Sequence, residues 1–354
     1  MTFSNRVLSV TQDEILPKAY DQVLSDNFAT FRFIGAGKKW SGSSLKRPVK
    51  LTTNTNGGSF SGLDTHSTAA VETRQLMEYD LRAYEMPVAI PGLDLLVNRT
   101  DAQIINLMRI ETESSANDAL DQIGGYFYLD GTGNSSKNFL GLDALVDDGT
   151  SATTIGGLSR STYSVLQGTR TASGGTMTLN KIGTLIDSVS GGSAVRQRPT
   201  MLVSNETVWS LYESLLTPTV RSNYDTNGYP MVTRSSKGAI AAGQFKGGQG
   251  FSSLIFRGIP WVADEKSTSQ TLWAVNENYL EWYGARDKDM SVPEFDNDIE
   301  GVYSELPSKN SGLQFSGFMK PINQYGVVGH IYLFGNLVTF QPRRHGRLTG
   351  ITQV

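Results

Sequence analysis

Apolar residues recur at three- and four-residue steps between residues 100 and 130, and this spacing predicts one long amphipathic helix. The face so defined comprises Ile104, Leu107, Met108, Thr112, Ala116, Ala119, Leu120, Ile123 and Phe127. The opposite face carries the carboxylates Asp101, Glu111, Glu113, Asp118 and Asp121. The capping box Thr100-Asp101-Ala102-Gln103 marks the start of the helix. A helix from residue 101 to 123 or 129 would be about 35 to 43 Å long, and Gly124-Gly125 either ends it or lets a neighbour pack closely.

The remaining pattern alternates short helices with short strands. Helical spacing recurs at 179–189, where Gly191-Gly192 ends the helix, and again at 208–215. A buried strand is predicted at 200–203, and further strands are predicted at 75–88, 254–256, 261–262 and 272–275. The window 325–340 is interrupted by Gly329, His330, Gly335 and Asn336, and it predicts two strands. The chain is therefore expected to have a mixed α+β fold.

The region 28–70 predicts a projecting basic β-hairpin. No carboxylate occurs between residues 28 and 63, where the cations are Arg32, Lys38, Lys39, Lys46, Arg47 and Lys50. A long polar hairpin has little apolar surface to bury within its own chain, so we expect it to lie against a partner. Phe33 and Trp40 are unusual in such a loop, and they indicate either contact with another chain or local packing. Residues 1–27, with Pro17, predict an extended arm containing one short helix.

Composition narrows the class of protein. The 354 residues include no cysteine, so neither a disulfide framework nor a thiolate metal site is possible. A net charge of −3 is atypical of a dedicated nucleic-acid binder. No apolar run reaches the length of a membrane span, and Met1 to Ser9 lack the pattern of a secretory signal. Residues 287–305 hold seven carboxylates against one lysine, which indicates a solvated loop or strand edge.

No motif supports catalysis or cofactor binding. Gly35-Ala36-Gly37-Lys38 lacks the glycine spacing of a phosphate-binding loop. His66, His330 and His345 lie far apart in sequence and outside any metal-ligand pattern. G-x-S-x-G is absent, so a hydrolytic triad would have to be chosen arbitrarily. We therefore predict no catalytic residue, no cofactor and no metal, and no enzymatic activity.

Several short motifs, taken in order, resemble a known family. They are Tyr126-Phe127-Tyr128-Leu129-Asp130-Gly131-Thr132-Gly133, then Phe139-Leu140-Gly141-Leu142-Asp143, Arg198-Pro199-Thr200-Met201-Leu202-Val203-Ser204-Asn205, Phe256-Arg257-Gly258-Ile259-Pro260-Trp261-Val262, and Gly335-Asn336-Leu337-Val338 to Pro342-Arg343. Together with the long helix, they resemble the major capsid proteins of tailed bacteriophages, which have the Hong Kong 97-type fold.

That resemblance implies a domain plan. Residues 1–27 would form an N-terminal arm and 28–70 an extended loop built as a β-hairpin. Residues 71–150 and 311–354 would form a peripheral domain with the long spine helix, and 151–310 an axial domain. It also implies a homo-oligomeric shell of hexamers and pentamers in a virion. Such an icosahedral head would assemble in the host cytoplasm with scaffold, portal and decoration proteins, and would contact packaged double-stranded DNA without base recognition.

The candidate contact residues follow from charge. We expect the hairpin of one subunit to cross the acidic face of a neighbour's spine helix. The residues proposed for this contact are Phe33, Lys38, Lys39, Trp40, Lys46, Arg47 and Lys50, facing Glu111, Glu113, Asp118 and Asp121. The resemblance leaves open a covalent bond from a hairpin lysine to an asparagine, with solvated or ion-paired lysines as the alternative. Arg343, Arg344 and Arg347 would contact either DNA phosphate or another subunit.

Two other functions stay open on the sequence. An encapsulin-like compartment is similar to the same fold but encloses enzymes. A β-rich carbohydrate-binding or hydrolytic protein belongs to a different class and would be a monomer with substrate-dependent activity.

Overall fold

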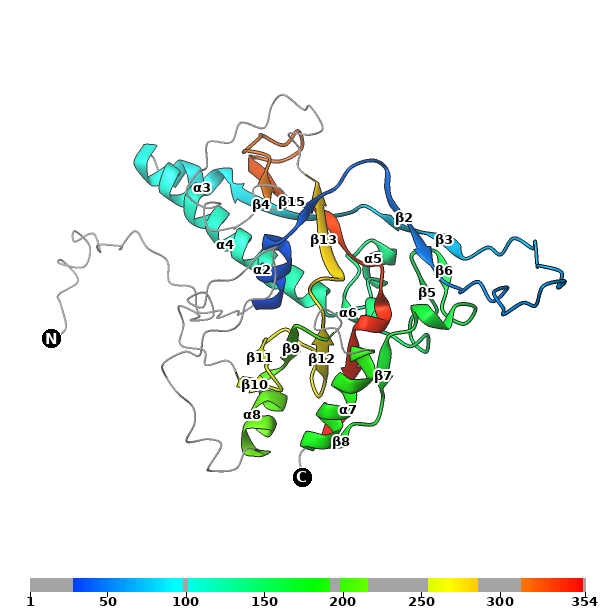
Figure 1. Ribbon diagram of the computed structural model, residues 1–354. Helices are drawn as coiled ribbons and strands as arrows, with labels where there is room; N and C mark the ends of the chain where they lie inside the picture. Colours follow the sequence, from blue (N-terminus) through cyan, green and yellow to red (C-terminus); the bar gives the residue numbers. More distant parts are fainter. Residues whose placement is uncertain (1–27, 98–100, 192–197, 216–253, 286–312, 353–354) are drawn as a thin grey trace, which may run out of the picture.

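The computed structural model describes residues 28–97, 101–191, 198–215, 254–285 and 313–352. The predicted N-terminal arm at 1–27 and the acidic stretch at 287–305 lie outside these residues. Two hydrophobic cores organise the chain, one around the spine helix and one around a second sheet. In Figure 1 the first occupies the upper half of the molecule and the second the lower half. The fold is α+β, as expected.

The first core lies between a mixed sheet and the spine helix α4. Four of its strands are hydrogen-bonded in the order β1-β13-β15-β14, and β4 pairs with the other edge of β15. The bounds are β1 Lys38–Lys39, β4 Arg82–Pro91, β13 Leu280–Ala285, β14 Gln314–Phe315 and β15 Gly326–Thr339. Helix α4 spans Asp101–Phe127 and packs against β4. Along the chain, the short helix α3 Gly92–Val97 precedes it, and α5 Gly133–Ser136 and α6 Leu142–Leu145 follow it.

The predicted spine helix is confirmed in extent, and the carboxyl-terminal part of its predicted apolar face is buried. Its 27 residues give a rod about 40 Å long. Ala116, Ala119, Ile123 and Phe127 are buried in the first core. The helix continues through Gly124-Gly125, so the alternative that the glycines permit close packing holds. Gly124 is buried, which agrees with that reading.

The second core lies under a six-stranded sheet. The strand order is β10-β11-β9-β12-β16-β7, with α7 packed on β16 and β7 and α8 on β11 and β9. The bounds are β7 Thr169–Thr171, α7 Leu179–Ser190, β9 Met201–Ser204, α8 Glu206–Leu215, β10 Leu254–Phe256, β11 Ile259–Ala263, β12 Leu272–Val275 and β16 Gly346–Leu348. The predicted helices and strands of this region are confirmed. Gly191 ends α7 in the left-handed conformation.

The remaining elements are small. Strands β5 Thr154–Ile155 and β6 Leu158–Ser159 form a hairpin, and β8 Gly175–Thr176 pairs with β17 Ile351–Thr352. Two 3-10 turns, η1 Ser164–Leu166 and η4 Pro342–Arg344, contact each other. The projecting hairpin consists of β2 Ser44–Lys50 paired antiparallel with β3 Arg74–Asp80.

The prediction that the hairpin starts at residue 28 is wrong. Phe28–Gly35 forms helix α2, and Lys38–Lys39 adds strand β1 to the main sheet beside β13. Phe33 is buried and stacks on Phe127 with ring centroids 5.3 Å apart. Aromatic residues such as Phe31 and Phe33 favour a strand by local propensity, but Phe33 lies in a helix that packs against the spine helix. The hairpin therefore spans 44–80, with 51–73 as its projecting loop.

Two further strand predictions need correction. Residues 75–88 form parts of two strands, because β3 pairs with β2 up to Asp80 and β4 pairs with β15 from Arg82. Residues 326–339 form one strand rather than two. Its glycines make room for aromatic rings, since a Cβ at Gly335 would lie 2.5 Å from the Trp282 ring and one at Gly329 2.6 Å from the Phe315 ring.

The sheets also divide the chain differently from the predicted domains. Strand β13, expected in the axial domain 151–310, pairs with β15 in the first sheet. Strand β16, expected in the peripheral domain 311–354, pairs with β12 and β7 in the second sheet. Both exchanges are long-range strand pairings, which local sequence patterns do not specify.

A buried ion cluster joins the two units where β16 enters the second sheet. The Asp147 Oδ2 accepts hydrogen bonds from the backbone N–H groups of Gly149, Ser151 and Ala152 at 2.9 to 3.0 Å. Its Oδ1 accepts from Arg347 at 2.5 Å and from Arg170 at 3.3 Å. Asp147 and Arg347 are both buried, so either charge would be costly without the other. Arg347 was expected to reach DNA or another subunit, and this burial rules out that role.

His345 lies beside this cluster and is fully buried. Its Nδ1 accepts a hydrogen bond from the Asn276 backbone N–H at 3.2 Å, and its Nε2 lies 3.2 Å from the Thr339 hydroxyl. Burial lowers the pKa of His345 from 6.5 to about 3. The ring is therefore neutral in the folded protein at neutral pH.

This neutral histidine predicts a pH-dependent loss of stability. The unfolded chain binds a proton at His345 below pH 6.5 and the folded chain does not, so the stability is lost as pH falls from 6.5 towards 3. Between pH 7 and pH 5 this site should remove about 2 kcal/mol from the free energy of unfolding. We expect His345→Asn to show a correspondingly smaller pH slope in urea unfolding. Parallel slopes for the two proteins would contradict the assignment.

Candidate functional site

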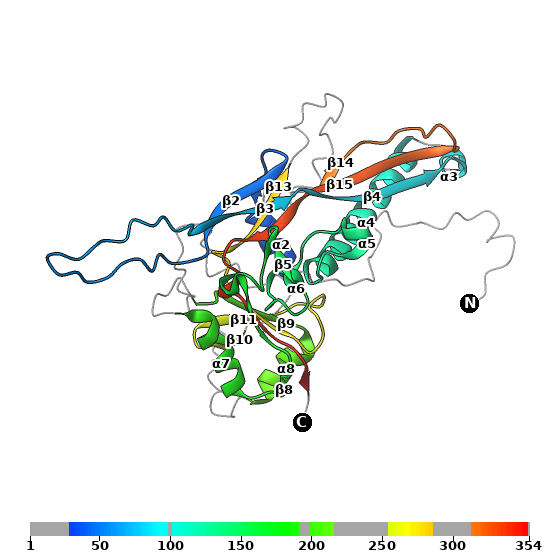
Figure 2. The same ribbon diagram turned by 90° about the vertical axis from the view of Figure 1, so that its right-hand side faces the viewer.

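The loop of the β2–β3 hairpin extends away from the body without covering from its own chain. Every residue from 52 to 72 is exposed. Figure 2 shows this loop on the side of the body opposite the β4–β15 ribbon. Two large apolar side chains lie near its end, Phe60 at 69% exposure and Leu63 fully exposed. An arm of this kind presents surface to another molecule.

Sparse local bonds shape the loop. Leu51 N–H donates to the Thr73 carbonyl at 2.9 Å, and the Asn56 side chain donates to the Ala69 carbonyl at 3.0 Å. At the tip, Asp64 N–H donates to the Ser61 carbonyl, and the Phe60 ring contacts His66 with centroids 4.8 Å apart. No strand pairing is present between residues 51 and 73. The loop keeps a hairpin course without the ladder that would make it rigid.

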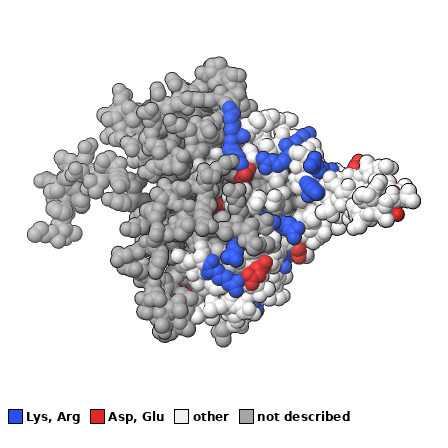
Figure 3. Space-filling model, in the orientation of Figure 1, with Lys and Arg blue, Asp and Glu red and all other residues white. Residues whose placement is uncertain are grey.

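The cations of the hairpin lie at its base. In Figure 3 the lysines and arginines gather over the body beside the hairpin, and the projecting tip is nearly free of them. Lys38 pairs with Glu281, and Lys46 pairs with Glu78 at 2.9 Å. The Arg47 guanidinium lies 4.4 Å from the centre of the Phe340 ring. Lys50 is exposed at the end of β2. The predicted basic surface therefore exists at the base, and Lys38 and Lys46 are already paired within the chain.

The two aromatic candidates belong to the body. Phe33 is buried against the spine helix, and Trp40 is buried in the same core with its Nε1–H donating to the Gly42 carbonyl at 2.9 Å. Of the two readings of these rings, local packing is the one that this chain adopts. The rings that the sequence singled out therefore anchor the start of the hairpin, and Phe60 and Leu63, which it did not single out, are the exposed ones. The sequence does contain a feature that could have identified them: each is a large apolar residue in a stretch of Gly, Ser, Thr and Asn.

The carboxylates of the spine helix are unequal. Glu111 and Asp118 are exposed on α4. Asp121 is half-buried and pairs with Lys266 at 2.7 Å within the chain. The side chain of Glu113 lies outside the described part. Glu111 and Asp118 are thus the described members of the predicted acidic face that remain open to solvent.

A small hairpin supports the base of the large one. Gly156-Gly157 turns between β5 and β6, with both glycines in the left-handed region. The Gly156 carbonyl accepts a hydrogen bond from the Glu78 backbone N–H at 3.0 Å. A Cβ at Gly156 would lie 3.0 to 3.1 Å from the side chain of Met77, which is completely buried. The β5–β6 turn therefore lies directly under β3 and fixes its position.

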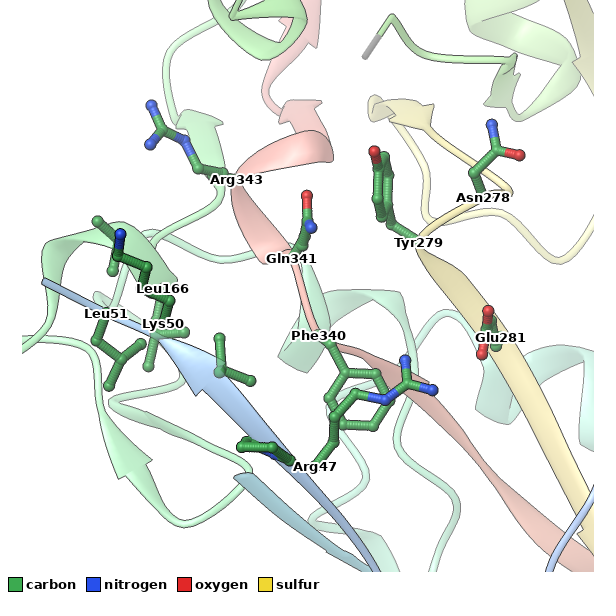
Figure 4. Close-up of a pocket in the computed structure, with 13 residues that line it drawn as sticks. Arg47, Lys50, Leu51, Leu166, Asn278, Tyr279, Glu281, Phe340, Gln341 and Arg343 are labelled. Carbon is green, nitrogen blue, oxygen red and sulfur yellow. The ribbon is translucent and has the colours of Figure 1, made fainter. Parts of the chain in front are cut away.

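A groove lies where the hairpin meets the body (Figure 4). It encloses about 470 Å³, a volume in the range of ligand pockets. Its walls come from β2, from Val165-Leu166, from the segment 278–281 and from the segment 340–343. The close-up shows Arg47 over the Phe340 ring, with Gln341 and Tyr279 beside each other. Arg47, Lys50 and Arg343 are its cations and Glu281 its carboxylate.

These surfaces do not assemble a catalytic or metal-binding arrangement. Within the described ranges, no group of three histidine, aspartate or glutamate side chains is placed to hold a metal ion. In the same part of the chain, no helix combines the length and apolar character needed to cross a membrane.

Solved structures resemble the chain over almost its entire length. A chain of the capsid asymmetric unit of cyanophage A-1(L) is 13% identical, with a TM-score of 0.70, and the match covers 99% of this chain and 100% of that chain. The capsid of Myoviridae phage XM1 gives 14% identity and a TM-score of 0.58, covering 99% of both chains. The SrpI encapsulin from Synechococcus elongatus PCC 7942 gives 12% and 0.53, covering 100% of this chain and 98% of that chain.

No protein-family model and no curated protein match the sequence. At identities this low, the structural likeness establishes the fold. The chain has the fold of phage capsid subunits, and the fold expected from its sequence motifs is confirmed.

The support beneath the hairpin can be tested by comparing its two glycines. Gly157→Ala should cost about 1 to 2 kcal/mol, because alanine is strained at positive φ and its Cβ would enter open space. Gly156→Ala should cost about 1 to 3 kcal/mol more, because its Cβ also crowds Met77. Chemical unfolding of both variants measures the difference. Equal decreases in the free energy of unfolding would show that the turn does not pack against β3.

Proposed function

We propose that this protein is a structural major capsid protein. It self-assembles into hexamers and pentamers of an icosahedral phage head that encloses double-stranded DNA. The observation that carries the proposal is the projecting hairpin loop, exposed from residue 52 to 72, on a fold that matches phage capsid chains over 99% of its length. Its role is structural, as a subunit of a virion assembled in the host cytoplasm.

The hairpin loop supplies the reason for assembly. Covering Phe60 and Leu63 would stabilise a contact by about 1.5 to 3 kcal/mol for each side chain that becomes fully buried. A single contact of this size is weak, and a closed shell repeats it in every subunit. A loop with few internal bonds also adapts to the slightly different neighbours that hexamers and pentamers provide.

Charge would orient the contact. The cationic base of the hairpin lies next to the arm that reaches the neighbour, and Glu111 and Asp118 are open on the spine helix. Each exposed pair contributes about 0 to 1 kcal/mol and is screened over roughly 8 Å at physiological salt. The pairs therefore set register and direction, and apolar burial supplies the strength.

Contact with DNA would be non-specific. Of the three arginines near the carboxyl end, Arg347 is buried in the ion cluster and Arg344 donates to the Ser190 carbonyl at 3.1 Å, at the end of α7. Arg343 is exposed. With a net charge of −3, the subunit suits a container that does not hold its contents tightly. Scaffold, portal and decoration proteins are the further partners that such a head would use.

An encapsulin-like compartment is the second candidate, because the SrpI encapsulin shares the fold at a TM-score of 0.53. The two functions differ in cargo. Purified particles that protect double-stranded DNA from nuclease indicate a phage head, and particles that contain a second folded protein indicate a compartment.

The two apolar tip residues test the assembly directly. Electron microscopy of the purified wild-type protein should show closed particles. Phe60→Ser/Leu63→Ser should abolish them and leave the free energy of unfolding within about 0.5 kcal/mol, because both side chains are exposed in the subunit. Leu179→Ser, at a partly exposed leucine on α7, is the matched control and should still assemble. Normal particles from the tip variant would refute the role of the hairpin, and a discrete wild-type monomer at high concentration would refute the shell.

Reversing the exposed charges of the spine helix tests the second contact. Glu111→Lys/Asp118→Lys should raise the subunit concentration needed for assembly about tenfold at low salt, equivalent to about 1.4 kcal/mol. The difference should shrink at high salt because the charges are exposed. Glu206→Lys/Glu265→Lys makes the same charge change at exposed carboxylates elsewhere and serves as the control. Light scattering measures the assembly threshold, and equal thresholds for both variants would exclude the spine helix.

A further inference from the structure

The groove at the base of the hairpin is positively charged, and its one carboxylate does not neutralise its cations. Its single carboxylate, Glu281, is already engaged, because it pairs with Lys38 and accepts a hydrogen bond from the Tyr283 hydroxyl at 2.8 Å. Arg47, Lys50 and Arg343 have no carboxylate partner among the described residues. The groove therefore offers three cations to whatever enters it.

The other lining residues favour a peptide. Asn278, Tyr279 and Gln341 provide neutral hydrogen-bonding groups, and Leu51, Leu166 and Phe340 provide apolar surface. The volume of about 470 Å³ holds a few side chains rather than a folded domain. Nucleic acid is bound by extended stripes of positive charge, whereas this patch is short and partly apolar. An acidic peptide fits both its charge and its size.

This chain contains one strongly acidic stretch, residues 287–305, with seven carboxylates against one lysine. The described strands on either side of it end away from the groove. Ala285 pairs with Phe334, and Gln314 pairs with Tyr332. Along β13, Ala285 lies four residues beyond Glu281 of the groove, a distance of about 13 Å. Every copy of the chain carries the same acidic stretch, so each subunit of a shell has neighbours with the charge that complements its groove.

We propose that the basic groove binds the acidic segment 287–305 of a neighbouring copy of this chain. The inference rests on the proposed function, since it requires subunits to lie side by side. It adds a second contact at the hairpin: the loop reaches outward to one surface, and the groove at its base receives a peptide. The three cations of the groove would be neutralised only when the acidic segment of a neighbour is bound there.

Charge reversal on each side provides the test. The groove variant is Lys50→Glu/Arg343→Glu, at two exposed residues, and it spares Arg47 because that side chain stacks on Phe340. The segment variant is Asp296→Lys/Asp298→Lys/Glu300→Lys. Each variant alone should need at least a tenfold higher subunit concentration to assemble. Lys137→Glu/Lys320→Glu carries the same charge change at exposed lysines outside the groove and should assemble normally.

Mixing separates contact between copies from contact within one copy. In an equimolar mixture, the reversed groove of one copy meets the reversed segment of the other, and the two unaltered surfaces also match. The mixture should therefore recover assembly to within about threefold of wild type, since opposite charges again face each other across each contact. Sedimentation velocity measures the assembled fraction.

Other outcomes overturn the inference. Recovery in a chain that carries both reversals, without recovery in the mixture, shows that the segment fills its own groove. Normal assembly of the groove variant with weakened retention of DNA assigns the groove to nucleic acid. Normal assembly of both single variants excludes the contact. In each of these cases wild-type particles still form, so the proposed function stands, whereas absence of wild-type particles would remove that function as well.

Discussion

A hairpin loop exposed along its entire length cannot be held in place by its own chain, and this constraint organises the molecule. The body supplies a firm base, since Met77 and Tyr79 of β3 are buried and the Tyr79 hydroxyl donates to the Thr339 carbonyl at 2.6 Å. Beyond Leu51 that support ends, and apolar side chains at Phe60 and Leu63 remain uncovered. Burial against another molecule is the available source of stability for such an arm.

Packed elements of the body fix the direction in which the hairpin projects. Strand β15 joins β4, β13 and β14 into one sheet, and α4 lies along it as a rod (Figure 2). The carboxyl end then crosses into the second sheet, where Asp147 and Arg347 pair inside the junction. The Gly156-Gly157 turn sits beneath β3. The hairpin therefore leaves the body at an angle set by packed elements, which is what a repeating assembly requires.

Local periodicity was sufficient for some elements and not for others. The spine helix and α7 followed from apolar spacing and from the glycine at the end of α7, because both signals act within a few residues. Helix α2 could not be predicted from the sequence, because its local residue preferences favour a strand and the contact that accompanies the helix, Phe33 on Phe127, is long-range. The exchange of β13 and β16 between sheets depends on pairing partners far away in sequence. The basic character of the hairpin was foreseen, but the position of its cations at the base depends on where the strands end.

The central claim is that residues 51–73 gain their covering from another copy of the chain. Amide hydrogen exchange, followed by mass spectrometry on assembled particles and on dissociated subunits, measures that covering. The account predicts fast exchange throughout this loop in subunits and strong protection in particles, with the body changing far less. Equal exchange in the two states, or a loop already protected in the subunit, would contradict it.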